Sequence, residues 1–309
     1  CWPTVTRTWA RTMGPRTDPG PDGVVVVDKP AGWTSHDVVA KSRGVLGTRK
    51  VGHSGPLDPS ATGVLVLGVG RATRLLRFLT ALPKSYTGEI VLGAETDTLD
   101  ADGEVTARHD MTQVTVDEVR AAAAALTGPI EQVPPMVSAV KVDGRRLNEI
   151  AREGGEVERA PRPVTVHRFD VEPLPGNPGV WRCEVDCSSG TYVRTLAADL
   201  GTSLGGGAHL RNLRRTAVGG FTLDDAGTID EPTVLPIAAA VAHLPATVVD
   251  DTVATLVGHG RVLAPEELGV DGEGPWAVLD PAGELVAVYE RTGARVKPSL
   301  VIPPPDSVP

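Results

Sequence analysis

The sequence has few cysteines and lacks long hydrophobic runs. Three cysteines, at positions 1, 183 and 187, are too few for a disulfide framework or a four-cysteine metal site. Cys183 and Cys187 lie on one strand-like run, roughly 13 Å apart if it is extended, which is too far for a disulfide. The apolar runs are of strand length or are interrupted by glycine, so none predicts a membrane span. Because the N-terminal region also lacks the apolar segment of a secretory signal, we expect a cytoplasmic protein.

Positive charge is scarce overall but concentrated in one segment. The formal net charge is −9, and twelve acidic residues between Asp224 and Glu284 face a single arginine, Arg261. From 41 to 84, by contrast, Asp58 is the one acidic residue among eight basic ones. Local charge governs phosphate attraction, so we expect a basic, RNA-binding face despite the acidic total. The basic residues are Lys41, Arg43, Arg49, Lys50, Arg71, Arg74, Arg77 and Lys84.

Length and composition predict two domains. A chain of 309 residues with 41% hydrophobic content can bury more than one core. Residues 1–22 are polar and rich in proline and glycine, which predicts a disordered leader. Beyond about residue 245 the chain becomes acidic with short strand signals. We therefore expect a main domain over 23–244, a small β domain over 245–302 and a tail over 303–309.

Hydrophobic patterns predict strands and helices within these domains. The run Val24–Val27 is typical of a buried strand, and Thr34 followed by Asp37 is typical of a helix start, with Gly47 ending that helix. Three arginines share one face of a helix expected over 71–81, where they track phosphates or form a solvated surface. The other expected elements are a strand over 84–92, a loop or hairpin over 95–110, a helix over 115–126, a strand over 181–187, a helix ending at 204 and a hairpin over 274–290.

The stretch Gly52–Gly63 carries the clearest chemical signal. It reads G-H-S-G-P-L-D-P-S-A-T-G, and a strand-like apolar run follows it. Asp58 precedes a proline, which disfavours helical dihedrals, and His53 lies five residues upstream. A lone carboxylate in such a stiff loop is suited to act as a nucleophile or general base, or it caps amides in a rigid turn.

This stretch resembles the signature loop of the TruB-type pseudouridine synthases, G-H-x-G-x-L-D-P-x-A-T-G. Pro56 departs from the family pattern, which usually has a small residue there, and it removes a backbone donor. Further motifs match the same family in order across roughly residues 23–220. They are D-K-P-x-G at 28–32, K-x-Y at 84–86, S-x-G-T-Y-x-R at 188–194 and H-L-R-N-L-R-R-T at 209–216.

The resemblance implies a role for individual residues. Asp58 is the implied nucleophile, Arg194 the partner that keeps it ionised by lowering its pKa, and Tyr86 the residue that stacks on the target base. The residues implied in substrate binding are His53, Tyr86, Tyr192, Leu213 and Lys29. For Lys29 a phosphate contact and a structural role remain equally open, and without the family Tyr86 is an ordinary half-buried strand aromatic.

The resemblance also implies a fold and a reaction. The expected fold is α+β: the pseudouridine synthase fold, with a mixed, mainly antiparallel sheet flanked by helices, followed by a small β-barrel (PUA-like) domain. The reaction converts uridine 55 in the T-loop of tRNA to pseudouridine after base flipping, without a metal or other cofactor. Attack at the ribose anomeric carbon and attack at C6 are both open. Residues 129–163 resemble a mobile thumb that closes over the RNA, although a plain charged helix and loop is the alternative.

Two functions of other classes compete with this one. A non-catalytic tRNA-binding or tRNA-folding protein needs the same basic face but not Asp58. An acid-using hydrolase normally needs a second carboxylate or a metal cluster, which the sequence does not indicate. Within the family, the thumb-like insertion and the absence of a lysine-rich tail favour a stand-alone monomer that binds the T-arm over a guide-RNA-dependent relative.

Overall fold

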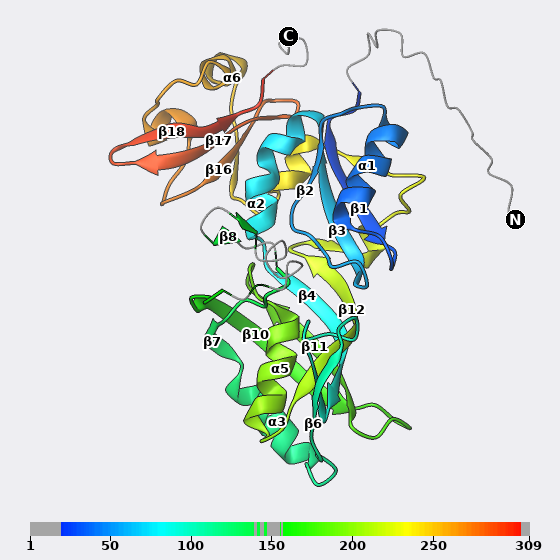
Figure 1. The fold of residues 1–309 in the computed structure, drawn as a ribbon. Helices are drawn as coiled ribbons and strands as arrows, with labels where there is room; N and C mark the ends of the chain where they lie inside the picture. Colours follow the sequence, from blue (N-terminus) through cyan, green and yellow to red (C-terminus); the bar gives the residue numbers. More distant parts are fainter. Residues whose placement is uncertain (1–19, 139–140, 143–144, 147–154, 156, 304–309) are drawn as a thin grey trace, which may run out of the picture.

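The structure, a computed structural model, describes residues 20–138, 141–142, 145–146, 155 and 157–303. Its centre is a ten-stranded sheet in the order β14-β1-β3-β12-β4-β11-β10-β7, with β2 beside β3 and β13 beside β12 (Figure 1). β12 runs parallel to β3, whereas the other strand pairs of this sheet in the described chain are antiparallel. The predicted α+β class with a mixed, mainly antiparallel sheet is therefore confirmed.

The elements of this main unit have the following bounds. The strands are β1 (Gly23–Lys29), β2 (Val51–His53), β3 (Thr62–Val69), β4 (Lys84–Leu92), β7 (Gly128–Gln132), β10 (Arg162–Pro173), β11 (Val180–Cys187), β12 (Ala208–Val218), β13 (Phe221–Thr222) and β14 (Val234–Leu235). The helices are α1 (Ser35–Leu46), α2 (Leu76–Ala81), α3 (Val116–Ala125) and α5 (Val193–Ser203), with the 3-10 segments η1 (Gly70–Leu75), η2 (Leu223–Asp225) and η3 (Ile237–Val241).

The valine run of β1 is buried on both faces of the sheet. Val24 and Val26 pack in a cluster with residues of η1, α2 and η3. Val25 and Val27 point the other way and pack with residues of α1. A strand covered by helices on both faces has no solvent side that requires polar residues, which explains the continuous apolar run. Figure 1 shows α1 and α2 on opposite sides of this part of the sheet.

The other half of the sheet is covered on one face by α3 and α5. Cys183, Val185 and Cys187 of β11 point toward these helices and are buried. The residues between them point outward, which explains the alternation in the sequence. Both cysteines are free, and burial raises the pKa of Cys183 to about 12 and that of Cys187 to about 11. They are core residues and, as predicted, do not form a disulfide.

Local capping signals place the helix ends. Thr34 caps α1 in a reciprocal capping box with Asp37, and Gly47 ends the helix in a left-handed conformation. Thr115 and Glu118 form the same box at the start of α3. The acidic segment after β4 forms the predicted hairpin, β5 (Ala94–Thr96) with β6 (Val105–Arg108).

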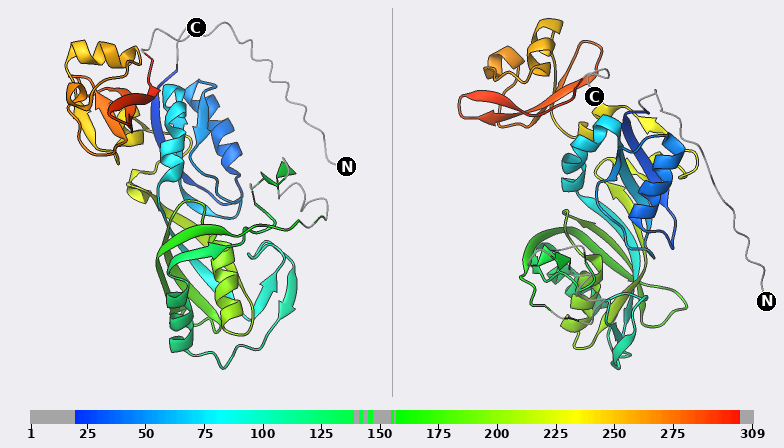
Figure 2. Two further views of the ribbon diagram at one scale, coloured as in Figure 1. Left: turned by 90° about the vertical axis from the view of Figure 1, so that its left-hand side faces the viewer. Right: turned by 45° about the horizontal axis from the view of Figure 1, so that its top comes forward.

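A small sheet domain follows the main unit, as predicted. Its four strands have the order β15-β16-β17-β18, and α6 (Asp251–Gly258) packs against β17 and β18. It shares a core cluster with the main unit, because Ala277, Leu285 and Val288 pack with residues of β1, β3 and α2. Figure 2 shows this domain beside α2 and far from α3. The likeness to a PUA barrel remains a prediction. The remaining bounds are β15 (Ala246–Val248), β16 (Trp276–Leu279), β17 (Leu285–Thr292), β18 (Arg295–Val301) and α7 (Pro265–Leu268).

Of the three arginines expected on one helix face, Arg71 and Arg77 bind other parts of the protein. Arg71 binds the carboxylate of Asp22 through its Nε (2.7 Å) and donates to Pro303 O at 2.7 Å. Arg77 donates to Ser299 O at 2.8 Å. Two of the three arginines therefore tie the main unit to the C-terminal end of the small sheet domain, and these contacts favour a structural role for them over phosphate tracking. The segment itself is a 3-10 turn followed by a short α-helix.

Three of the predicted regions lie partly outside the described residues. The leader over 1–22 is described from Gly20 onward, and Asp22 is held by Arg71 rather than free. The predicted tail is described at Pro303 alone. In the thumb-like region over 129–163, the two ends belong to β7 and β10 of the main sheet, and residues 139–140, 143–144, 147–154 and 156 lie outside the described residues. None of the helices in the described ranges is long and apolar enough to cross a membrane.

Candidate active site

The loop between β2 and β3 carries Asp58 and is held from two sides. Ser35 Oγ, at the start of α1, accepts from Leu57 N at 2.9 Å and donates to Leu57 O at 3.3 Å. On the other side Arg215 of β12, 1% exposed, donates to Gly55 O at 3.1 Å and to Pro56 O at 3.3 Å. Pro56 lacks a backbone donor, but its carbonyl is one of the anchors. Charge-assisted bonds from a buried guanidinium make this loop rigid.

Gly63 closes the signature loop at a point where no side chain fits. Its φ is +102°, and a Cβ atom there would lie 2.1 Å from Arg215 O. The loop also closes on itself, because Asp58 O accepts from Ala61 N at 3.1 Å. Glycine at the end of the motif thus lets β3 run directly against β12.

Lys29 is buried and bound to backbone carbonyls. Its side chain is 0% exposed, and Nζ donates to Trp33 O at 2.6 Å and to Pro59 O at 3.1 Å. A third bond goes to Pro30 O at 3.0 Å. Burial lowers the pKa of Lys29 to about 8. These contacts favour the structural alternative over a phosphate contact, since Nζ already joins the β1 end to the residue after Asp58.

Arg194 of α5 brings two carboxylates together. Its Nη2 lies 3.1 Å from Asp58 Oδ2, and its Nη1 lies 3.1 Å from Asp100 Oδ2. Backbone carbonyls complete the shell, because Thr98 O accepts from Nη1 at 3.1 Å and Val137 O from Nη2 at 2.9 Å. The Arg194 side chain is 7% exposed, whereas that of Asp58 is 43% exposed. The guanidinium is thus fixed in the interior and presents Asp58 at an accessible surface.

Arg194 acts on the pKa of Asp58 in the predicted direction but is not the largest effect. Burial raises the pKa of this carboxyl, and Arg194 opposes the rise, while the negative charges of Asp100 and Asp102 add to it. The net shift of the pKa is therefore upward. Loss of solvation on the inner side of the carboxyl outweighs one ion pair whose arginine is shared with a second acid.

Tyr86 and Leu213 lie in the same apolar cluster as Leu57 of the loop. Tyr86, on β4, is 8% exposed, and burial raises the pKa of its hydroxyl. Leu213 is partly buried at the edge of the cluster. The structure therefore places both residues in the wall that borders the Asp58 loop. Lys84 of the same K-x-Y motif has a structural role, because its Nζ donates to Thr80 O at 2.9 Å and to Leu82 O at 2.7 Å.

His53 stands at the start of the loop against a second histidine. The rings of His36 and His53 form a T-shaped pair with centroids 5.4 Å apart. The Nδ1 atom of His53 accepts from Gly55 N at 3.3 Å. Burial lowers the pKa of His53, and nearby His36 and Arg215 lower it further. A neutral His53 with its Nδ1 occupied has its proton on Nε2.

The predicted basic face is only partly available for binding RNA. Lys41 pairs with Asp230 at 2.7 Å, and Arg43 donates to Val51 O at 3.1 Å. With Lys84 buried and two arginines bound to the C-terminal strand, most of the eight cations already have partners. Among the described residues, the side chains of Arg49, Lys50 and Arg74 are exposed and make no hydrogen bond or ion pair. Fewer of these basic side chains are therefore available to bind phosphates than the clustering of positive charge in the sequence suggests.

The sequence analysis missed three residues of this site. Asp100 lies in an acidic turn that was interpreted only as a loop, although its Asp-x-Asp-Gly ending is typical of a tight, hydrogen-bonded turn. Arg215 lies within the quoted motif at 209–216 but was given no role. Gln132 precedes a Pro-Pro turn, and its amide bonds to the backbone of Tyr192. Only long-range contacts distinguish these residues from ordinary surface polar groups.

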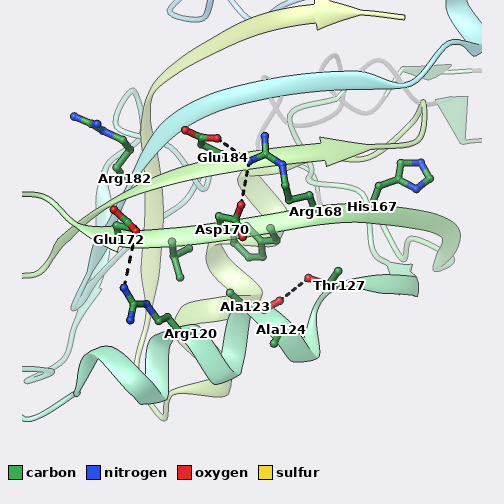
Figure 3. Close-up of a pocket in the computed structure, with 12 residues that line it drawn as sticks. Arg120, Ala123, Ala124, Thr127, His167, Arg168, Asp170, Glu172, Arg182 and Glu184 are labelled. Carbon is green, nitrogen blue, oxygen red and sulfur yellow. Dashed lines mark hydrogen bonds and ion pairs between the residues drawn. The ribbon is translucent and has the colours of Figure 1, made fainter.

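A groove elsewhere in the described chain is separate from this site. It has a volume of about 790 Å³ and lies between α3 and the part of β10 that β7 does not cover. Figure 3 shows Arg168 reaching Asp170 and Glu184 across it, and Arg120 reaching toward Glu172. These charges neutralise one another, and none of the predicted site residues lines it. In the described ranges no group of three or more His, Cys, Asp or Glu side chains could hold a metal ion.

Comparison with known families and proteins agrees along the chain. Residues 43–193 match the N-terminal domain of the TruB family pseudouridylate synthases. Residues 194–241 match the tRNA pseudouridylate synthase B C-terminal domain, and residues 244–303 match the tRNA pseudouridine synthase II C-terminal domain.

Individual relatives cover nearly the whole chain. A protein named tRNA pseudouridine synthase B from an Arthrobacter species is 48% identical over 93% of this chain and 98% of its own. One of the same name from Rhodococcus jostii is 51% identical over 91% and 94%. Among solved structures, an H/ACA RNP bound to a substrate RNA containing 2'-deoxyuridine has a TM-score of 0.68 at 26% identity, covering 93% of this chain and 87% of that one. A Cbf5-Nop10-Gar1 complex has a TM-score of 0.70 at 27% identity, covering 91% and 84%. The sequence motifs, the sheet that carries them and these likenesses agree: the chain belongs to the TruB family of pseudouridine synthases.

Proposed function

We propose that this chain converts uridine 55 in the T-loop of tRNA to pseudouridine, with Asp58 as the nucleophile. The observation that carries the proposal is the 3.1 Å contact between Arg194 Nη2 and Asp58 Oδ2 in a loop anchored on both sides. Nucleophilic attack needs an ionised carboxylate, and a fixed guanidinium favours that form against the effect of burial. The relatives named tRNA pseudouridine synthase B support tRNA as the substrate.

The proposed reaction is an isomerisation that needs no oxidant and no cofactor. The uridine leaves the stack, and Asp58 attacks either the ribose anomeric carbon or C6 of the ring. The N-glycosidic bond breaks, the uracil turns, and C5 bonds to the anomeric carbon. The bond to Asp58 breaks, the proton on C5 leaves and N1 takes one up, so the product has the composition of the substrate.

The neighbouring side chains suit the binding of a flipped base. We infer that Tyr86 stacks on the uracil, and that Leu213 and Tyr192 border the pocket. His53 is suited to hold the opened RNA, since a neutral ring with Nδ1 occupied leaves its Nε2–H as a donor. Lys29 is assigned to the support of the loop rather than to RNA.

We also propose that the enzyme acts on the T-arm as a stand-alone monomer in the cytoplasm. Two solved neighbours are an H/ACA RNP and a Cbf5-Nop10-Gar1 complex. The relatives of about half identity, which align over almost their whole length, are named as tRNA enzymes instead. Their much higher identity favours action without a guide RNA.

The test is tritium release from tRNA that carries 5-tritiated uridine. Wild type should release tritium, and Asp58→Asn should release none while binding tRNA with unchanged affinity. Asp186→Asn on the outer face of β11 is the control and should release tritium like wild type. If wild type binds tRNA without release, a non-catalytic tRNA-folding protein is the better description.

A further inference from the structure

Gln132 holds the backbone at the start of α5 with both ends of its amide. Oε1 accepts from Tyr192 N at 2.7 Å, and Nε2 donates to Tyr192 O at 3.1 Å. The side chain is 2% exposed and comes from the end of β7, sixty residues earlier in the chain. Tyr192 is the N-cap residue of α5 and makes no side-chain capping bond. The amide of Gln132 is therefore what fixes the entry to this helix.

The segment that follows Gln132 contacts the same helix again. Val137 O accepts from Arg194 Nη2 at 2.9 Å, the nitrogen that also faces Asp58. Between these points, Pro134 O accepts from Arg159 Nη1 at 3.0 Å, which joins the segment to the chain just before β10. Residues 132–138 thus connect the main sheet to the Arg194–Asp58 pair. Hydrogen bonds hold this segment at Gln132, Pro134 and Val137.

We propose that Gln132 is a positioning residue for the synthase reaction: by fixing the Tyr192 backbone it sets where Arg194 reaches Asp58. The inference rests on the proposed function, because it assigns Gln132 to the pair on which that function depends. Arg194 lies two residues beyond Tyr192, in the first turn of α5, so a shift of the helix entry moves the guanidinium directly. Tyr192, proposed above to border the pocket, shifts with it.

Glutamine suits this position because the Tyr192 backbone offers both a donor and an acceptor. The carbonyl of Tyr192 also accepts the first helical bond, from Leu196 N at 3.0 Å, so Nε2 uses its second lone pair. Methionine has a similar length but provides neither bond. Glutamate can accept from Tyr192 N, but when ionised it faces Tyr192 O without a proton. When protonated it can make both bonds.

These differences define the experiment. Gln132→Met and Gln132→Glu are compared with wild type by single-turnover tritium release from pH 5 to 9, and the Asp58 carboxyl is titrated by ¹³C NMR in each protein. Val257→Ala, a buried truncation in the small sheet domain, is the control for lost stability. Temperatures are kept where all four proteins are folded.

We expect Gln132→Met to slow the single-turnover step about 10- to 100-fold, the size of effect that misplacing a group by about 1 Å produces. Its acid limb and the NMR midpoint of Asp58 should move to higher pH, because Arg194 then pairs less closely with Asp58. The ratio of the Gln132→Glu rate to the wild-type rate should fall as pH rises, whereas the Val257→Ala ratio should stay flat.

Unchanged Asp58 midpoints in both Gln132 variants would overturn the inference, whatever the rates. A loss of stability in Gln132→Met with a wild-type rate and pH profile would overturn it as well. The NMR midpoint does not require turnover. If wild type releases no tritium, the proposed function fails, and the midpoints still decide whether Gln132 positions Arg194 against Asp58.

Discussion

Arg194 meets Asp58 with a 3.1 Å contact between Nη2 and Oδ2, and the same guanidinium holds Asp100 through Nη1 at 3.1 Å. One cation is thus shared between an accessible carboxylate and a less exposed one. Burial is the main reason why the net pKa shift of Asp58 is upward although an arginine touches it, and the negative charge of Asp100 adds to the rise. Arg194 and Asp100 therefore shift the pKa of Asp58 in opposite directions, and replacing each in turn separates the two effects.

Replacing Arg194 should move the acid limb of the pH–rate profile, where the rate falls as Asp58 is protonated, to higher pH. Arg194→Met removes the attraction that opposes the burial effect, so the pKa of Asp58 rises further and less of it is ionised at low pH. The single-turnover rate should fall at every pH and fall most at the acid end. Arg182→Met, an exposed arginine on the outer face of β11, is the matched control and should keep the wild-type profile. An acid limb that does not move in Arg194→Met would contradict the proposed ion pair.

Replacing Asp100 should move the acid limb the other way. Asp100→Asn removes a negative charge that raises the pKa of Asp58, while the amide oxygen can still accept from Arg194. The pKa of Asp58 should therefore fall, and the rate at acid pH should rise relative to its plateau. Asp102→Asn tests the same effect with a smaller expected shift, because Asp102 is the lesser of the two causes. A shift to higher pH in Asp100→Asn would mean instead that anchoring of Arg194 dominates.

Lys29 should control stability rather than RNA binding. Lys29→Met removes three hydrogen bonds to backbone carbonyls, of which Pro59 O keeps Gly32 N as a donor, and this should lower the free energy of unfolding by about 1–3 kcal/mol at pH 7. The loss should widen as the pH rises from about 8 toward 10.5, because folded Lys29 gives up its proton near pH 8 whereas the unfolded chain keeps it. Unfolding then takes up a proton, so raising the pH opposes unfolding of wild type.

Chemical denaturation at pH 7, 9 and 10 measures the difference in the free energy of unfolding between wild type and Lys29→Met. The comparison cancels the parallel contribution of Lys84, whose pKa burial also lowers to about 8. Affinity for tRNA should be unchanged in the folded variant. A variant of wild-type stability with weakened tRNA binding would restore the phosphate-contact alternative.

Arg74 and Arg77 should respond differently to removal, although they lie one turn apart. The Arg74 side chain is exposed and has no hydrogen-bond or ion-pair partner among the described residues, so Arg74→Ala should weaken RNA binding and lower the salt slope by about 0.7–0.9 if it meets one phosphate. Arg77 donates to Ser299, so Arg77→Ala should loosen the C-terminal strand and leave the salt slope unchanged. Filter binding from 50 to 300 mM salt and hydrogen exchange at β18 measure the two effects. Equal losses of RNA affinity in both variants would contradict this division.

Local structure in this chain is predictable from short stretches of sequence. The valine run of β1, the capping box of α1 and the alternation of β11 each express a periodicity or a cap that neighbouring residues complete on their own. The order of the motifs was equally readable, and it pointed to Asp58, Arg194 and Tyr86 before any contact was known. The family that those motifs indicate is the one to which the chain belongs.

What charged and polar side chains bind was not readable in this way. Lys29 and Lys84 look like surface lysines in the sequence and are buried on carbonyls, and Arg71 and Arg77 look like a phosphate-binding face and hold the C-terminal strand. Asp100 and Gln132 gave no signal, because their partners lie on other elements. The sequence alone determined where strands and helices form, since these depend on neighbours along the chain, and its ordered motifs indicated the family. Tertiary structure alone decided the partner of each buried charge, because a charge removed from water binds whichever groups the packed sheet brings within reach.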